Sequence, residues 1–137
     1  MKAVAIDLAA IGDTDPLYRD WLEDAGRRFR VDVSALDEQL PNWRTLLERF
    51  AEERAPVYFR RDAEISSAMR RLEASGLLIG VFTDAPEELA RVALTHLGAL
   101  GRIDALEAGG DSKQRVLKRL GHDTTVVGTR AELLALT

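Results

Sequence analysis

The chain has 137 residues, which is the length of one domain and enough to bury a layered hydrophobic core. Nineteen basic and twenty-three acidic residues give a formal net charge of -4, spread over mixed stretches, so a nucleic-acid-binding surface is not expected. The absence of cysteine excludes a disulfide framework and a thiolate metal site. No run approaches the roughly 20 apolar residues of a membrane span, and no signal peptide precedes the first strand, so we expect a cytoplasmic protein.

Short apolar runs alternate with helical periodicity along the chain. Strands are predicted at residues 3–6, 77–82, 103–106 and 124–127. Helices are predicted between them at residues 62–75, 86–97 and 113–120. Each of these helices is followed by a glycine that suits a left-handed C-terminal cap. This alternation predicts an α/β domain with a mainly parallel sheet that helices cover on both faces.

The first predicted strand ends at Asp7 and runs into a polar turn. Ala9 stands two residues later, so no second acid follows at that spacing. In parallel sheets, ligands bind just beyond the carboxyl ends of the strands. Asp7 is therefore a candidate site residue.

The stretch at residues 15–58 differs from the rest because it carries both tryptophans. Asp15 and Pro16 predict the start of a helix with the aspartate as its N-cap. A second helix is predicted over about residues 42–53. The side chains expected to pack these helices on each other, rather than to contact a ligand, are Trp21, Trp43, Leu46 and Phe50.

The second predicted strand leads into Thr83 and Asp84 and then into a helix. A hydroxyl and free helix N-terminal amides at the carboxyl end of a strand favour an anion. We therefore predict that Thr83 binds an anion through its hydroxyl and Asp84 through its backbone N–H. The Asp84 carboxylate is interpreted as a helix cap, because Glu87 follows it at capping-box spacing.

These features together resemble the haloacid dehalogenase (HAD) superfamily of hydrolases. The first motif of its phosphatases is Asp-x-Asp-x-Thr, and residues 7–9 match the first aspartate of this motif but not the second. Residues 65–106 match the family pattern of helix, glycine, buried strand ending in Thr-Asp, helix, Leu-Gly pair and strand. The resemblance implies one three-layer, Rossmannoid α/β/α domain over residues 1–137, with residues 15–58 as a reduced helical cap after the first strand.

The resemblance also implies roles for single residues. Asp7 stands in the position of the nucleophile, and Thr83 and the Asp84 backbone stand where family members bind the phosphoryl group. Lys113 stands where a catalytic lysine neutralises the nucleophile and the phosphate. Lys118, further along the same helix, is assigned to a solvated face.

Two positions depart from the family pattern. Ala9 replaces the acid that protonates the leaving group, and Thr129 replaces an aspartate that holds Mg²⁺. Glu132 is the nearest acid to Thr129, and the two residues fit a capping box of their own. Mg²⁺ is the cofactor that the family implies, but Asp7 is the one retained ligand, unless Asp13 swings in. No other cofactor is indicated.

One further pair is interpreted as structural. Asp111 and Ser112 precede the helix that carries Lys113, and Gln114 follows Asp111 at capping-box spacing. We therefore expect Asp111 to cap this helix rather than to bind a ligand.

Three functions stay open. The first is a phosphomonoesterase with weak or lost activity, because losing acid/base help costs about 10²–10⁴-fold. The second is a metal-independent hydrolase of the dehalogenase type, because dehalogenases keep the nucleophilic aspartate and have a non-acidic residue two positions later. The Schiff-base chemistry of phosphonoacetaldehyde hydrolases is disfavoured, because it needs a lysine in the cap and residues 15–58 contain none. The third is a non-catalytic pseudoenzyme that binds an anion or a protein. The partner favoured here is a small phosphorylated or anionic molecule, with a homo-oligomer also open, and neither nucleic acid nor a membrane.

Overall fold

The computed structural model describes residues 1–136, in which the strands form a single parallel sheet. The strands are β1 (Ala3–Asp7), β2 (Leu78–Thr83), β3 (Ala105–Ala108) and β4 (Thr124–Val127). They lie in the order β3-β2-β1-β4, and each neighbouring pair is parallel. The predicted α/β class and parallel sheet are therefore confirmed, and β1 and β2 occupy the centre of the sheet.

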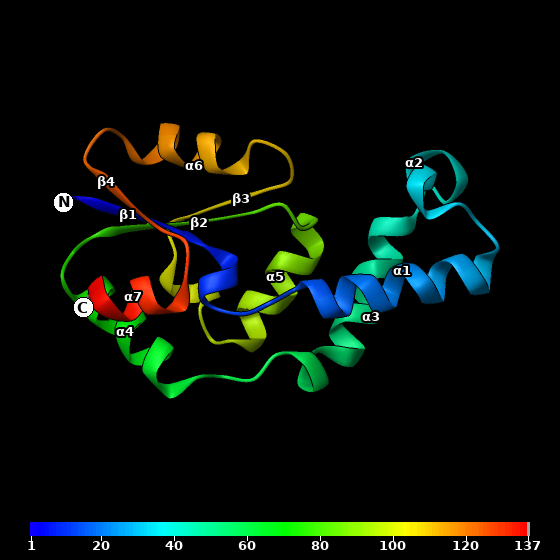
Figure 1. Ribbon diagram of the computed structural model, residues 1–137, viewed down its shortest axis with the longest axis horizontal. Coiled ribbons are helices and arrows are strands. Elements are labelled where there is room, and N and C mark those ends of the chain that lie inside the picture. The colour runs from blue at the N-terminus through cyan, green and yellow to red at the C-terminus, as the bar shows by residue number, and fades with distance from the viewer. Residues whose placement is uncertain (137) are drawn as a thin grey trace.

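Helices cover both faces of this sheet. The helices are α1 (Asp15–Phe29), α2 (Leu36–Gln39), α3 (Trp43–Tyr58), α4 (Ala63–Ala74), α5 (Glu87–His96), α6 (Ser112–Leu120) and α7 (Arg130–Leu136). α6 lies on one face, and α4, α5 and α7 lie on the other (Figure 1). The alternation of side chains along each strand explains this arrangement, because Ala5 and Phe82 join the α6 cluster while Ile6 and Val81 join the larger core.

Gly80 allows α6 to pack closely on β2. A Cβ atom at Gly80 would lie 2.6 Å from Val116 Cγ2 and 2.7 Å from Leu120 Cδ1, so any larger side chain would push α6 away. The glycines predicted to end three helices, Gly76, Gly98 and Gly121, have φ values of 77°, 74° and 95°. All three φ values are positive, which favours glycine, and the helices end within one residue of the prediction, although Gly121, with a ψ of -171°, lies outside the left-handed helical region.

The third strand begins two residues later than predicted, at Ala105 instead of Ile103. Asp104 explains the shift, because its N–H donates to the Ile79 carbonyl at 2.7 Å while its carboxylate accepts from the Ile79 N–H at 2.8 Å. The Asp104 side chain thus takes the place of a backbone acceptor at the start of this edge strand.

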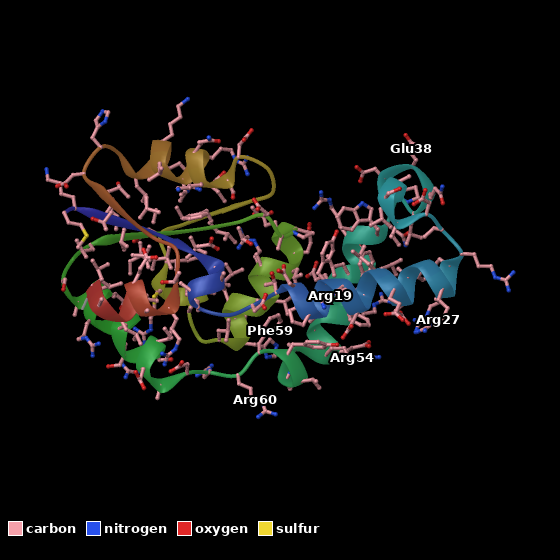
Figure 2. The ribbon with its side chains drawn as sticks, viewed as in Figure 1. Arg19, Arg27, Glu38, Arg54, Phe59 and Arg60 are labelled. Carbon is pink, nitrogen blue, oxygen red and sulfur yellow. The ribbon has the colours of Figure 1, made fainter. Side chains whose placement is uncertain are left out.

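The helices α1, α2 and α3 form an insert that extends away from the sheet to one side (Figure 1). Trp21 and Trp43 join α1 to α3, with ring centroids 6.0 Å apart and only 2% and 7% of their surfaces exposed. Leu46 and Phe50 are partly buried against the same core. The predicted packing between these helices is confirmed, and the outer surface of the insert is charged, with Arg27 and Glu38 pointing outward (Figure 2).

Both helices of the insert differ from prediction at their ends. Asp15 is the first residue of α1 rather than its N-cap, and the Asp15 N–H donates to the Asp13 carboxylate at 3.0 Å. The second helix continues to Tyr58, past Pro56, because Ala51 and Ala55 are fully buried and their packing outweighs one lost backbone hydrogen bond.

The insert is also attached to the core. α3 packs along α5, and Arg44 on α3 forms a 3.0 Å ion pair with Glu88 on α5. No helix within residues 1–136 is long and apolar enough to cross a membrane.

Candidate functional site

The carboxyl ends of β1 and β2 lie side by side and form the candidate site. Asp7 pairs in register with Phe82, and Thr83 is the next residue of β2. A pocket of about 170 Å³ has Asp7, Thr83 and Asp84 in its lining, together with residues 12–15. A second pocket, of about 260 Å³, shares these three residues and adds Lys113. The fold therefore brings four predicted site residues, Asp7, Thr83, Asp84 and Lys113, to one edge of the sheet.

Thr129 lies at the same edge without lining either pocket. β4 pairs with β1 through Val127 and Ile6, and Thr129 follows two residues later. It is absent from the lining of both pockets that contain Asp7. Thr129 therefore shares the carboxyl edge of the sheet with Asp7 but not its pockets.

Asp7 is engaged in the local structure that follows β1. One of its carboxylate oxygens accepts the Ala9 N–H at 3.0 Å and caps a 3₁₀ turn over residues 8–10. Ala9 itself is exposed and lines the first pocket. The position of the second acid is thus accessible, but it offers only a methyl group.

The Thr83 side chain bonds within the turn that follows β2. Its hydroxyl accepts the Ala85 N–H at 3.1 Å, and Thr83 is 8% exposed. The interpretation of Asp84 as a helix cap is wrong, because α5 begins at Glu87 and its N-cap position is Pro86, in an extended conformation. The Thr83 hydroxyl keeps its own hydrogen for donation to a ligand.

Comparison with solved structures supports this fold, whereas comparisons of the sequence alone find no match. No family model and no curated protein matches the sequence. Among solved structures, this chain is similar to a protein from Thermotoga maritima described as a beta-phosphoglucomutase, with a TM-score of 0.58 over 92% of this chain and 75% of that chain. The fold is haloacid dehalogenase-like. At 22% sequence identity, the likeness to this structure supports the HAD-like fold alone.

Thr129 and Glu132 form a capping box at the start of α7, as predicted. The Thr129 hydroxyl accepts the Glu132 N–H at 3.1 Å and donates to the Glu132 carboxylate at 3.2 Å. Glu132 therefore serves the start of α7. This contact leaves the site with no acid from the end of β4.

The predicted cap at α6 is wrong. Asp111 occupies the N-cap position but makes no side-chain hydrogen bond there. Its φ of 60° places it in the left-handed region, whereas a capping side chain needs an extended backbone. The side chain that holds this loop is Arg115, which bonds to the carbonyl oxygens of Ala108 and Gly110.

The charge around the site is mainly negative. Besides Asp7, the acids that line the two pockets are Asp13, Asp15, Asp84 and Asp111. Lys113 is the one cation among the lining residues of the two pockets within the described part of the chain. A bound anion would therefore be attracted by Lys113 and the nearby amides and repelled by Asp7.

Of the positions that the family resemblance assigns to magnesium ligands, Asp7 alone carries a carboxylate. Mg²⁺ prefers near-octahedral oxygen coordination with at least one or two carboxylates. Within residues 1–136, no three histidine, aspartate or glutamate side chains gather in a way that could hold a metal. Asp13 accepts the Asp15 N–H through one carboxylate oxygen.

Proposed function

We propose that this chain is a HAD-type domain of the phosphatase kind, in which phosphomonoester hydrolysis is weak or lost and the site keeps weak affinity for a small anion. Two positions beside the Asp7 carboxylate carry this proposal. Ala9 stands in place of one acid and Thr129 in place of another, and Thr129 and Glu132 are bonded to each other. Neither position offers Asp7 the proton donor or the metal ligand that the family pattern places there.

The missing groups bear on particular steps of the reaction. Attack by an Asp7 oxygen on phosphorus would release an alkoxide, and no acid stands at position 9 to protonate it. Such acid catalysis contributes about 10²–10⁴-fold, and a metal ion supplies several kcal/mol of further charge stabilisation. Binding needs fewer groups, because the Thr83 hydroxyl, Lys113 and the amides near the start of α5 can hold an anion without a metal.

The insert is proposed to act as a reduced cap. α1 starts at Asp15, which lines the first pocket, so the insert leaves the core next to the site. α3 packs along α5, and the ion pair between Arg44 and Glu88 joins the two helices. Ala9, Asp13 and Asp84 are exposed, so the site is open to small ligands.

Phosphate titration tests the proposed anion site. Asp7→Asn should bind inorganic phosphate about two- to fivefold more tightly than the parent, because it removes a repelling charge. Lys113→Ala should bind phosphate about two- to fivefold more weakly, because it removes the attracting one. Calorimetry or NMR titration without divalent ions gives the three dissociation constants.

Lys118→Ala is the matched control for this titration. It removes the same charge from the same helix, and Lys118 is exposed and lines neither pocket. Its phosphate affinity should equal that of the parent. If none of the four proteins responds to millimolar phosphate, the anion-binding proposal is wrong, and a protein-binding surface becomes the better explanation of the fold.

A further inference from the structure

The connection between β3 and α6 has an unusual backbone for the segment that presents Lys113. Gly109 has a φ of 89° and Asp111 a φ of 60°, so two of its three residues are left-handed. The Gly109 N–H donates to the Thr83 carbonyl at 2.9 Å. This short connection therefore joins the Thr83 backbone to the start of the helix that carries Lys113.

Arg115 holds this connection from α6. Its Nε donates to the Glu107 carboxylate at 2.9 Å, and its two terminal nitrogens donate to the carbonyl oxygens of Ala108 and Gly110. A guanidinium can make these bonds together because its donors are arranged in a rigid planar fork. One side chain thus ties the end of β3, the connection and the first turns of α6 to one another.

Glu107 provides a charged anchor for this arrangement. Only 19% of its side chain is exposed, and its second oxygen accepts from Arg119 at 2.8 Å. The hydrogen bond from Arg115 lowers the pKa of Glu107, and the bond from Arg119 lowers it further. Glu107 is therefore ionised at neutral pH and keeps Arg115 aligned with the loop carbonyls.

We infer that Arg115 is a positioning residue for the anion site, which sets the place of Lys113 relative to Thr83 by fixing the backbone of residues 108–111. The inference rests on the proposed function, since it assumes that Thr83 and Lys113 bind one anion. Arg115 itself lines neither pocket that contains Asp7, so it acts on the ligand only through the loop.

Arg119 offers a closely matched comparison. It lies on the same helix, carries the same charge and bonds to the same glutamate, but no hydrogen bond joins it to the loop carbonyls. Arg115→Gln should weaken phosphate binding about two- to fivefold, as Lys113→Ala does, whereas Arg119→Gln should leave it unchanged. Equal weakening by both variants would reduce the effect to net charge and overturn the positioning role.

Arg115→Lys separates positioning from stability. Lysine keeps the charge next to Glu107 but cannot reach both carbonyls in the geometry of a fork. We expect Arg115→Gln to lower the melting temperature. Arg115→Lys should recover the melting temperature of the parent but not its phosphate affinity. A full recovery of affinity would show that charge at this position is sufficient, and the inference would be wrong.

Amide resonances of Gly109, Gly110 and Lys113 report on the loop without any ligand. They should shift in Arg115→Gln and stay in place in Arg119→Gln. If the loop shifts and the phosphate affinity does not change, Arg115 is structural only. If the parent binds no phosphate, the proposed function fails and the positioning role fails with it, while the amide shifts still show whether Arg115 holds the loop.

Discussion

Replacing Ala9 and Thr129 together by aspartate should raise Mg²⁺-dependent hydrolysis of an aryl phosphate by about 10²–10⁴-fold over the parent chain. The first substitution supplies an acid for the leaving group, and the second supplies a carboxylate that can share a metal ion with Asp7. The measurement is the rate of aryl alcohol release with Mg²⁺ and with a chelator, for the parent, both single variants and the double variant.

The chain should tolerate both substitutions. Ala9 is exposed at the rim of the first pocket, so a longer side chain has room there. Thr129 caps α7, and aspartate can accept the Glu132 N–H in the same way, but it loses the hydrogen bond that the Thr129 hydroxyl donates to the Glu132 carboxylate. The control combines Ala9→Asp with Thr129→Asn, which keeps the cap without adding the second charge. A double variant that folds and binds Mg²⁺ but hydrolyses no faster than this control would show that the site lacks phosphatase geometry.

Trp43→Ala should destabilise the fold by about 3–5 kcal/mol, the usual result of truncating a large buried aromatic side chain. Trp43 is 7% exposed, its ring lies against that of Trp21, and its indole N–H donates to Asp37 at 2.7 Å. The substitution would open a cavity between α1 and α3 and leave the Asp37 carboxylate without this donor. Urea unfolding, followed by circular dichroism, measures the change in the free energy of unfolding.

Val57→Ala is the comparison for this experiment, because Val57 lies on the same helix and is 71% exposed. Its removal should change the free energy of unfolding by less than about 0.5 kcal/mol. If the two variants have similar stability, the tryptophan contact does not hold the insert together.

The parts of this fold that the sequence predicts well depend on local patterns. The ends of α4, α5 and α6 follow from glycines with positive φ, and β4 follows from a short run of β-branched residues, Thr-Thr-Val-Val. The capping box at Thr129 and Glu132 was also predictable, because both partners lie within one turn of the same helix. The Asp7 and Thr83 positions followed from the order of strand ends in a parallel sheet.

The errors arise where backbone conformation decides which side chain can bond. Asp84 and Asp111 are each followed three residues later by a residue that suits a capping box, Glu87 and Gln114. Asp84 nevertheless does not cap α5, because Pro86 occupies the N-cap position, and Asp111 does not cap α6 because its backbone is left-handed. The role of Arg115 in holding the loop was not predicted, because two of its hydrogen-bond acceptors are backbone carbonyl oxygens, which a pattern of side chains does not reveal. The ion pair between Glu107 and Arg115 could have been predicted from their spacing only if the first residue of α6 had been known.

Asp7 and Thr83 each have a structural role that does not depend on catalysis. Asp7 caps the turn after β1, and Thr83 closes the turn after β2. Asparagine can accept the Ala9 N–H as the Asp7 carboxylate does, so Asp7→Asn removes the nucleophile and its charge without removing this hydrogen bond. The variant therefore separates a chemical role of Asp7 from its structural one.

The rate of aryl phosphate hydrolysis by the unmodified chain with Mg²⁺, compared with that of Asp7→Asn, tests the proposed loss of catalysis most directly. We predict that both proteins hydrolyse the substrate near the background rate, because the site supplies neither the acid nor the metal ligands. A substantial Mg²⁺-dependent rate in the unmodified chain that Asp7→Asn abolishes would contradict this prediction and identify the chain as an active phosphatase.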